Sequence, residues 1–402
     1  MILEELLNGL CSEEFYADYW DQVPLRVPGH PDRFKKLYSI KEFESRLTES
    51  DLRFPQIKVT SDGTVIDKSE YTTKRTIGGV ETDNFIDVPA VYRLWNEKAT
   101  ITIHSLHTNA PSIIPWLRQL ELELCHPVQA NAYITPPYAK GFKVHYDTHD
   151  VFILQAHGQK HWRVWENRDE AKPLDNESFE APSEYSPSGP PIFDDKLTQG
   201  EVLYIPRGYL HEARSGDDVS LHITVGVLVN RLIDALEALM NSVLQTITEG
   251  GSQIWRDTLS SSYLSSSDAA FDTLKDDTLA LMSDMWSTKF VANKFRNQLW
   301  PVNLDMLSNT VRIDALGTTS RLEVAPFVTP IIERSGERLT LLYSGRRLEL
   351  PLTAESALNQ MMAKAEFTPE DLSDYERQSS IGLCRRLLKD GFLRFSDALD
   401  AG

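Results

Sequence analysis

The sequence has few cysteines and no long apolar run. Its three cysteines, Cys11, Cys125 and Cys384, lie far apart and form no CxxC pair. We therefore expect neither a disulfide framework nor a zinc–thiolate site, and we expect a reducing, cytoplasmic location. No run of about 18 apolar residues occurs, so we expect no membrane-spanning helix and no membrane partner. Glu4 and Glu5 stand where a secretory signal peptide carries positive charge.

Positive charge is also scarce. The 402 residues include 41 Lys and Arg against 59 Asp and Glu, a net charge of -18. Such a field repels nucleic acids and anionic membranes and attracts basic partners. The sequence has no Gly-rich phosphate loop, no GxSxG nucleophile elbow and no HExxH helix. With 41% hydrophobic and 25% charged residues, it is typical of a globular protein of two or three domains.

Three stretches differ in their hydrophobic pattern. From about 101 to 228, short runs at strand period alternate with Gly and Pro, which predicts a β-sandwich or barrel. Within it, 166–200 includes four prolines in ten residues, PSEYSPSGPP, and is predicted to be a long surface loop. Apolar residues then recur every three or four positions from Leu232 to Ile247, which predicts an amphipathic helix. Beyond 300, strand-like segments precede helix-like ones that end in KDGFLRF, a pattern consistent with a small winged-helix-like α+β module.

The segment KVHYDTHDVFILQ carries the strongest chemical signal. His145 and Asp147 are separated by one residue, so on a strand both side chains project from the same face. Two histidines and one carboxylate form the facial triad that holds non-heme Fe(II) with open positions. The segment EVLYIPRGYLHEA supplies the third ligand, His211, after a strand and a Pro-Arg-Gly turn. The alternative is that His145 and Asp147 are ordinary polar strand residues.

Alternation identifies further candidates. Gln129, Asn131 and Tyr133 share one face of a strand, and Ser220, His222 and Thr224 share one face of another; these faces line the lumen of a barrel or else meet solvent. We expect His222 to contact substrate or to support the metal ligands. Lys160 follows a Gly turn, and a lysine that points into a barrel suits an anionic cosubstrate.

Other histidines compete as metal ligands. His149 lies two residues beyond Asp147 and could reach the same face, but DTHD is typical of a strand bend. The remaining ones are interpreted as surface or core residues: His104, His107, His157 and His161.

The segments HYDTHDVFILQAHGQKHWRVW, LYIPRGYLHEA and SLHITV resemble the JmjC-type, cupin-fold 2-oxoglutarate oxygenases, in particular the ribosomal oxygenases, which hydroxylate ribosomal proteins. FYADYWDQVPLRVPG resembles the entry segment of that group. The resemblance implies a mainly β double-stranded β-helix (the cupin/JmjC jelly roll) in a catalytic domain over 1–228. It also implies an α-helical dimerisation region over 229–300, hence a homodimer, and a winged-helix-like domain over 301–402.

The resemblance also implies a set of site residues. His145, Asp147 and His211 would hold Fe(II), and the three positions left on the metal would take 2-oxoglutarate and O2. Lys160 would bind the distal carboxylate of 2-oxoglutarate, with Asn131 beside it, and Tyr133 would lie near the peptide substrate. Some bacterial members of the family have Arg where this chain, like the eukaryotic members, has Lys160.

The expected function is hydroxylation of an Arg or His side chain of a basic protein, in the first place a ribosomal protein. Residues 166–218 carry 13 acidic and five basic side chains, which would steer a basic segment to the site if they rim it. Alternatives are demethylation of N-methyl-lysine, hydroxylation of another peptide, and a cupin-like binding or scaffold protein. Residues 301–402 hold 12 basic and 15 acidic side chains, so we expect no direct binding of DNA.

Overall fold

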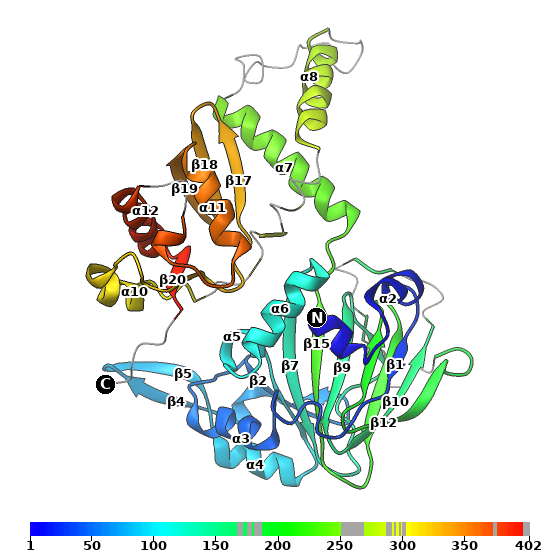
Figure 1. The fold of residues 1–402 in the computed structure, drawn as a ribbon. Coiled ribbons are helices and arrows are strands. Elements are labelled where there is room, and N and C mark those ends of the chain that lie inside the picture. The colour runs from blue at the N-terminus through cyan, green and yellow to red at the C-terminus, as the bar shows by residue number, and fades with distance from the viewer. Residues whose placement is uncertain are drawn as a thin grey trace. The chain divides into compact units, whose positions relative to one another are not determined.

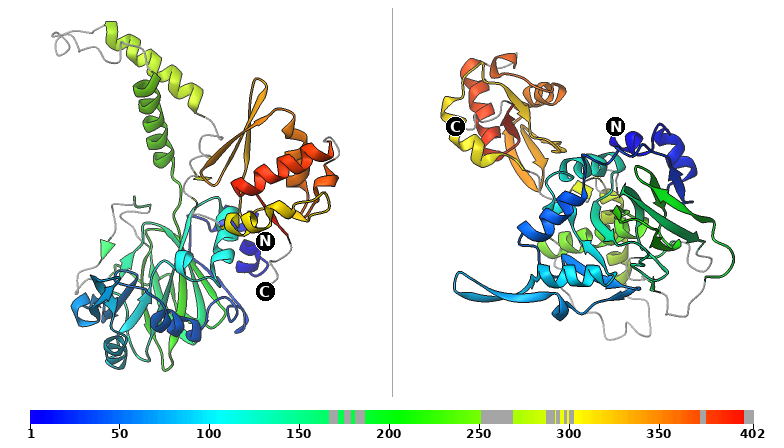
Figure 2. Two further views of the ribbon diagram at one scale, coloured as in Figure 1. Left: turned by 90° about the vertical axis from the view of Figure 1, so that its left-hand side faces the viewer. Right: turned by 90° about the horizontal axis from the view of Figure 1, so that it is seen from below.

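The computed structural model describes residues 1–166, 172–174, 179–180, 187–250, 269–286, 292, 295–296, 299, 303–372 and 376–396. The chain divides into two compact units, residues 1–229 and 230–402 (Figures 1 and 2). The division into a helical dimerisation region over 229–300 and a winged-helix-like domain over 301–402 stays a prediction. Among the described residues, no helix combines the length and hydropathy needed to cross a membrane.

Two antiparallel sheets form the framework of the first unit, as the strand pattern predicts. The larger sheet has the order β1–β13–β9–β15–β7–β6–β2–β3. Its strands are β1 Leu25–Val27, β2 Ile57–Ser61, β3 Thr64–Val65, β6 Thr100–Ile103, β7 Val128–Thr135, β9 Asp150–His157, β13 Val202–Ile205 and β15 Ser220–Val227. The smaller sheet has the order β11–β8–β14–β10–β12. Its strands are β8 His145–Tyr146, β10 Gln159–Trp165, β11 Phe179–Glu180, β12 Phe193–Thr198 and β14 Leu210–Ser215.

The buried strand β9 shows how one strand serves two cores. Val151 and Ile153 pack with Trp162 of the smaller sheet. Phe152 and Leu154 point the other way and join the main core on the outer side of the larger sheet. The period of two along a strand thus separates a core between the sheets from a core beneath the helices.

Helices cover the outer side of the larger sheet. They are α1 Ile2–Leu6, α2 Ser12–Asp18, α3 Ile40–Glu49, α4 Val88–Asn96, α5 Leu106–Asn109 and α6 Ile114–Leu124. Side-chain caps fix two starts: Ser39 accepts the N–H of Glu42 at α3, and Asp87 accepts the N–H of Ala90 at α4. The short helix η1, Lys68–Glu70, leads to a hairpin of β4 Thr72–Ile77 and β5 Val80–Ile86, which projects from the unit in Figure 1.

The predicted loop over 166–200 is wrong at two places, at β11 and near its end. Residues 193–198 form β12, which pairs with β10. Strand β12 lies at the edge of the smaller sheet, where exposed charged residues are common. Its exposed residues Asp194, Asp195 and Lys196 break the hydrophobic alternation that would predict a strand. Half of the Pro-rich segment PSEYSPSGPP, residues 182–186, lies outside the described residues.

The second unit begins with α7, Leu232–Gly250, which confirms the predicted amphipathic helix, and α8, Ala269–Met285. Then follow α10 Met306–Arg312, η3 Ile313–Ala315, β16 Leu322–Val324, β17 Ile331–Ser335, β18 Arg338–Tyr343, β19 Arg346–Pro351, α11 Ala354–Ala363, η4 Pro369–Asp371, α12 Arg377–Asp390 and β20 Leu393–Phe395. Strands β17, β18 and β19 form one sheet, and β16 pairs with β20. The winged-helix-like character of this module stays a prediction.

Candidate metal centre

The structure brings together the three residues that the sequence singles out. His145 on β8 lies directly opposite His211 on β14, and Asp147 follows β8 by one residue. One potential ligand atom from each residue lies within 4.8 Å of those from the other two. Three ligands of this chemistry at this spacing can hold one divalent transition-metal ion and leave positions on it open.

Backbone carbonyls orient both histidines for ligation. Nδ1 of His145 lies 2.9 Å from the carbonyl oxygen of Lys143, and Nδ1 of His211 lies 3.0 Å from that of Tyr209. A carbonyl only accepts hydrogen bonds, so each Nδ1 carries the proton and each Nε2 keeps its lone pair for a metal.

The protonation states suit the same role. Burial, with a smaller contribution from the charge of His145, lowers the pKa of His211 to about 4, so its ring is neutral near pH 7. Burial alone would raise the pKa of Asp147, but His149, His145 and His211 together hold it below its usual value. The set therefore offers two imidazoles, each with Nε2 directed away from its backbone partner, and one carboxylate.

A buried network fixes the turn that leads to His211. The carboxylate of Asp150 accepts hydrogen bonds from the hydroxyl of Tyr204 and from the backbone N–H of Arg207. The guanidinium of Arg207 reaches Asp21, with Nε 3.0 Å from the carboxylate. Burial raises the pKa of Asp150 to about 6. This network ties the N-terminal segment to the Pro-Arg-Gly turn.

Lys160 is a buried cation for which no described carboxylate serves as a counterion. Its side chain is 4% exposed, and Nζ lies 3.2 Å from the hydroxyl of Thr135, a neutral group. Burial lowers the pKa of Lys160 to about 7. A charge buried in this way fits an anionic ligand, since a carboxylate placed beside it would restore its ordinary pKa.

The metal-ligating set and Lys160 line one cavity of about 260 Å³ between the two sheets. The walls come from eight strands and three loop positions: Lys58, Thr60, Val65, His104, Tyr133, Phe142, His145, Asp147, Val151, Ile153, Lys160, Trp162, His211, Glu212, Ala213, His222 and Thr224. Three of the residues on the two strand faces that were candidates for a barrel lumen line this cavity: Tyr133, His222 and Thr224.

An aromatic stack forms part of the wall. The rings of Tyr133 and His222 lie parallel with centroids 4.8 Å apart, and the edge of Trp162 meets His222 at 5.5 Å. Nδ1 of His222 and Nε1 of Trp162 are buried with no hydrogen-bond partner among the described residues. Burial, then the charge of Lys160, lowers the pKa of His222 well below its usual value. Nδ1 of His222 and Nε1 of Trp162 are therefore both available to contact a ligand.

Asn131 makes a contact between two neighbouring segments of the larger sheet. Its Oδ1 accepts the backbone N–H of Ser105 at 3.0 Å, and the residue is not among those that line the cavity. It holds the chain after β6 against β7. A direct contact of Asn131 with a cosubstrate stays a prediction.

The other histidines lie outside the metal-ligating group of the described residues. His149 lies beside Asp147, with Nε2 3.4 Å from the amide nitrogen of Gln129. Nδ1 of His107 accepts the backbone N–H of Ala130 at 3.2 Å, and His161 pairs with Asp194 at the surface.

The sequence pattern did not predict the cavity residues that come from the first 104 residues. Lys58 and Thr60 lie on β2, and His104 directly follows β6. The signal was the alternation in IKVTS, where Ile57 and Val59 are buried. Nothing in that local pattern shows which sheet the strand joins.

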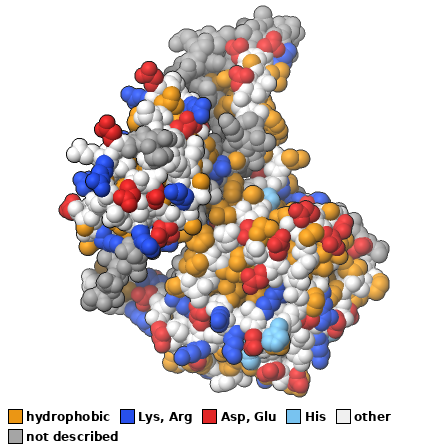
Figure 3. All heavy atoms as spheres, in the orientation of Figure 1, with side chains coloured by type: hydrophobic (Ala, Val, Ile, Leu, Met, Phe, Trp, Pro, Cys, Tyr) orange, Lys and Arg blue, Asp and Glu red, His pale blue; other side chains and the backbone are white. Residues whose placement is uncertain are grey.

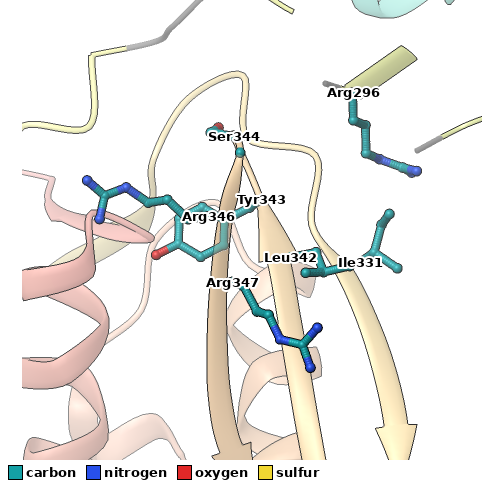
Figure 4. Close-up of a pocket in the computed structure, with 8 residues that line it drawn as sticks. Arg296, Ile331, Leu342, Tyr343, Ser344, Arg346 and Arg347 are labelled. Carbon is teal, nitrogen blue, oxygen red and sulfur yellow. The ribbon is translucent and has the colours of Figure 1, made fainter. Parts of the chain in front are cut away.

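A second cavity, of about 200 Å³, lies within the second unit (Figure 4). Arg296 and Arg347 flank it, and Ile331 and Leu342 form an apolar part of its wall, while Arg346 points to the other side of the hairpin. None of the residues that line this cavity is a histidine, cysteine or carboxylate. It is therefore not a candidate metal site.

Comparisons with known proteins agree with this geometry. The JmjC domain family matches residues 105–234. The chain is 32% identical over 251 residues to the bifunctional lysine-specific demethylase and histidyl-hydroxylase NO66 of Drosophila mojavensis, covering 61% of this chain and 27% of that protein. It is also 32% identical over 250 residues to ribosomal oxygenase 1 of Gallus gallus, covering 61% of this chain and 39% of that protein. The chain thus spans less than half the length of these relatives.

Among solved structures, the chain is similar to YcfD, a ribosomal oxygenase from Escherichia coli, in complex with cobalt and 2-oxoglutarate. The TM-score is 0.59 at 17% identity, over 96% of this chain and 99% of that one. At this identity the likeness shows a shared fold, which agrees with the two facing antiparallel sheets.

Proposed function

We propose that this protein, which carries a JmjC domain at residues 105–234 and is related to the ribosomal oxygenases, is an Fe(II)- and 2-oxoglutarate-dependent hydroxylase of a protein side chain. The observation that carries the proposal is one cavity that holds both the group of His145, Asp147 and His211 and the buried Lys160, for which no described carboxylate is a counterion. A metal site alone would fit many functions, but a metal site facing a buried cation fits a metal-chelating acid.

The residues present fit iron and its cosubstrate. Two imidazoles and one carboxylate suit Fe(II), and Lys160 with the hydroxyl of Thr135 suits the distal carboxylate of 2-oxoglutarate. When bound there, Fe(II) and 2-oxoglutarate supply the oxidative chemistry that consumes O2, releases succinate and CO2, and hydroxylates a C–H bond.

The residues of the protein position the metal ligands and the substrate, and they exclude water from the cavity. The carbonyls of Lys143 and Tyr209 fix the histidine tautomers, and the network around Asp150 holds the turn before His211. The parallel rings of Tyr133 and His222 give the cavity a rigid aromatic wall, against which we place the substrate side chain. Such a preset wall keeps the reacting carbon near the metal position.

The substrate we propose is an Arg or His side chain in a basic segment of a ribosomal protein. The acidic balance of residues 166–218 and the net charge of -18 favour such a segment. On the face shown in Figure 3, acidic and basic side chains are interspersed, so the negative charge is spread over that face. Attraction of a basic protein would therefore be long-ranged and sensitive to salt.

A lysine demethylase is the second candidate, because the Drosophila relative is named for both activities. The same iron chemistry on an N-methyl group would lower the product mass by about 14 Da, whereas hydroxylation raises it by about 16 Da. The test is incubation of the purified protein with Fe(II), 2-oxoglutarate and basic ribosomal peptides, with succinate and product mass measured. Peptide-dependent succinate and a gain in mass support the hydroxylase, and loss of a methyl group supports the demethylase.

We also propose that the protein forms homodimers through α7. Leu232, Leu236, Met240 and Leu244 recur every four residues along this helix and are exposed, while Leu239 and Val243 are buried. An exposed apolar stripe of this length is typical of an interaction surface.

The three free cysteines support the proposed cytoplasmic location.

A further inference from the structure

One cation in the cavity comes from outside the JmjC match. Lys58 on β2 lines the cavity, whereas the match begins at residue 105. Lys58 lies opposite Thr102 of β6, which lies opposite Tyr133 of β7. Residues directly opposite one another project from the same face of a sheet. Lys58 and Tyr133 therefore share the face that forms the cavity wall.

The described part of the cavity wall offers no free carboxylate to a cation. Only two carboxylates line it, Asp147 and Glu212. Asp147 belongs to the metal-ligating group, and Glu212 already pairs with Lys140 and Arg163. No ion pair among the described residues includes Lys58, which is partly buried.

The neighbour of Lys58 adds no negative charge. Burial, and next the charge of Lys58, lower the pKa of His104 to about 4, so this ring is neutral near pH 7. His104 lines the same cavity. The wall formed by β2 and the end of β6 is therefore cationic, and it is built from a sheet that faces His145 and His211.

We propose that Lys58 is a specificity-determining residue that keeps cationic side chains out of the cavity and selects the neutral imidazole of a histidine. The inference rests on the proposed hydroxylase function and deepens it. A guanidinium or a methylated ammonium group carries a charge that Lys58 repels and has no acceptor atom for it. A neutral imidazole has one acceptor nitrogen, which the ammonium group of Lys58 can meet. Basic residues that flank the target remain outside the cavity, where the net negative charge of the protein favours them.

The experiment compares pairs of basic peptides that differ only in having His or Arg at the central position. The wild-type protein, Lys58→Glu and Lys58→Met are each tested for hydroxylation by mass spectrometry and, without 2-oxoglutarate, for peptide binding by fluorescence anisotropy. Lys41→Glu is the control, since Lys41 is exposed on α3, does not line the cavity and undergoes the same change of charge. Thermal unfolding shows whether each variant is folded. If Lys58→Glu does not fold, the comparison of Lys58→Met with the wild type tests the role of Lys58.

We expect the wild type and Lys41→Glu to prefer the His peptide by about 10-fold or more, in kcat/KM and in binding. Lys58→Met should lose most of this preference, and Lys58→Glu should reverse it. A wild type that prefers Arg, or a preference unchanged in both Lys58 variants, overturns the inference. If binding preference reverses but no peptide is ever hydroxylated, the proposed function fails while the role of Lys58 stands. If hydroxylation occurs without any reversal, the function stands and the role of Lys58 fails.

Discussion

The backbone N–H of Gly208 donates a hydrogen bond to the carbonyl oxygen of Asp147 over 2.9 Å. One metal-ligating residue is thereby tied directly to the turn that leads to another, His211. Gly208 has φ +82, in the left-handed region that glycine adopts without strain. The neighbouring Arg207 anchors the same turn to Asp21 and Asp150. The position of His211 relative to Asp147 thus depends on contacts made by the whole turn.

Removal of the Arg207 side chain tests this dependence. Arg207→Ala leaves the buried side of Asp21 without its main partner, so we expect a loss of about 2–4 kcal/mol in the free energy of unfolding. Turnover should fall as well, because the turn before His211 loosens. Urea unfolding measures the loss. The matched control is Arg93→Ala, which breaks an exposed pair with Glu97 on α4 and should cost at most about 0.5 kcal/mol. Equal losses in both variants would contradict the anchoring role.

Removal of a metal-ligating side chain tests the metal centre. His145→Ala, Asp147→Ala or His211→Ala should abolish turnover of 2-oxoglutarate and weaken binding of Fe(II), because two ligands cannot hold the ion in the open geometry. Anaerobic titration with Fe(II) and succinate release measure both effects. His161→Ala serves as the control, since His161 lies at the surface and pairs with Asp194. Normal metal binding by all three variants would refute the assignment.

The depressed pKa of Lys160 predicts proton uptake when 2-oxoglutarate binds. In the free protein its pKa is about 7, whereas a carboxylate beside it raises the value. Above pH 7, binding must therefore take up a proton, and affinity should fall as pH rises from 7 toward 10. Without ligand, the unfolded chain binds this proton more tightly, so this group makes stability rise with pH over the same window.

Titration calorimetry at pH 8 in two buffers of different ionisation heat measures the uptake, with Mn(II) in place of iron to prevent turnover. Lys160→Arg is the control, because a guanidinium stays protonated and should show no uptake. Lys160→Ala should weaken binding of 2-oxoglutarate by about 1.5–3 kcal/mol, the contribution of a charge-assisted hydrogen bond. Identical heats in both buffers for the wild type would contradict this account of Lys160.

The exposed stripe on α7 predicts a change of oligomeric state. Leu236→Glu combined with Leu244→Glu places two charges in the proposed interface and should give monomers, because burial of an unpaired charge is unfavourable. Light scattering at micromolar concentration measures the mass. Gln245→Glu, at an exposed polar position of the same helix, should leave the dimer intact. A wild-type protein that is monomeric under these conditions would rule out the proposed interface.

Local sequence pattern predicted the centre of the site because that part of the fold is locally encoded. One residue separates His145 from Asp147 on the chain, and the strand period of two alone predicts that both project from the same face of the strand. Lys160 could be placed because a turn at Gly158, with φ +64, precedes its strand. The amphipathic helix α7 is also a local pattern, and it was predicted within a few residues.

The parts that could not be predicted depend on contacts between distant segments. Arg207 meets Asp21 across 186 positions, and Lys58 reaches the cavity only because β2 pairs with β6, one strand in from the edge of the sheet. Periodicity reports which face of a strand is buried, but not which strands are neighbours. The edge strand β12 was missed because its exposed charged residues carry no hydrophobic alternation.

We propose above that this protein hydroxylates a side chain of a ribosomal protein with iron held by His145, Asp147 and His211. Mass spectrometry of ribosomal proteins from cells with the wild-type protein, with Asp147→Ala and with neither tests it most directly. We predict a gain of about 16 Da on one residue of one ribosomal protein, present only with the wild type. Ribosomal proteins of identical mass in all three, or a difference of about 14 Da that marks a lost methyl group, would contradict the claim.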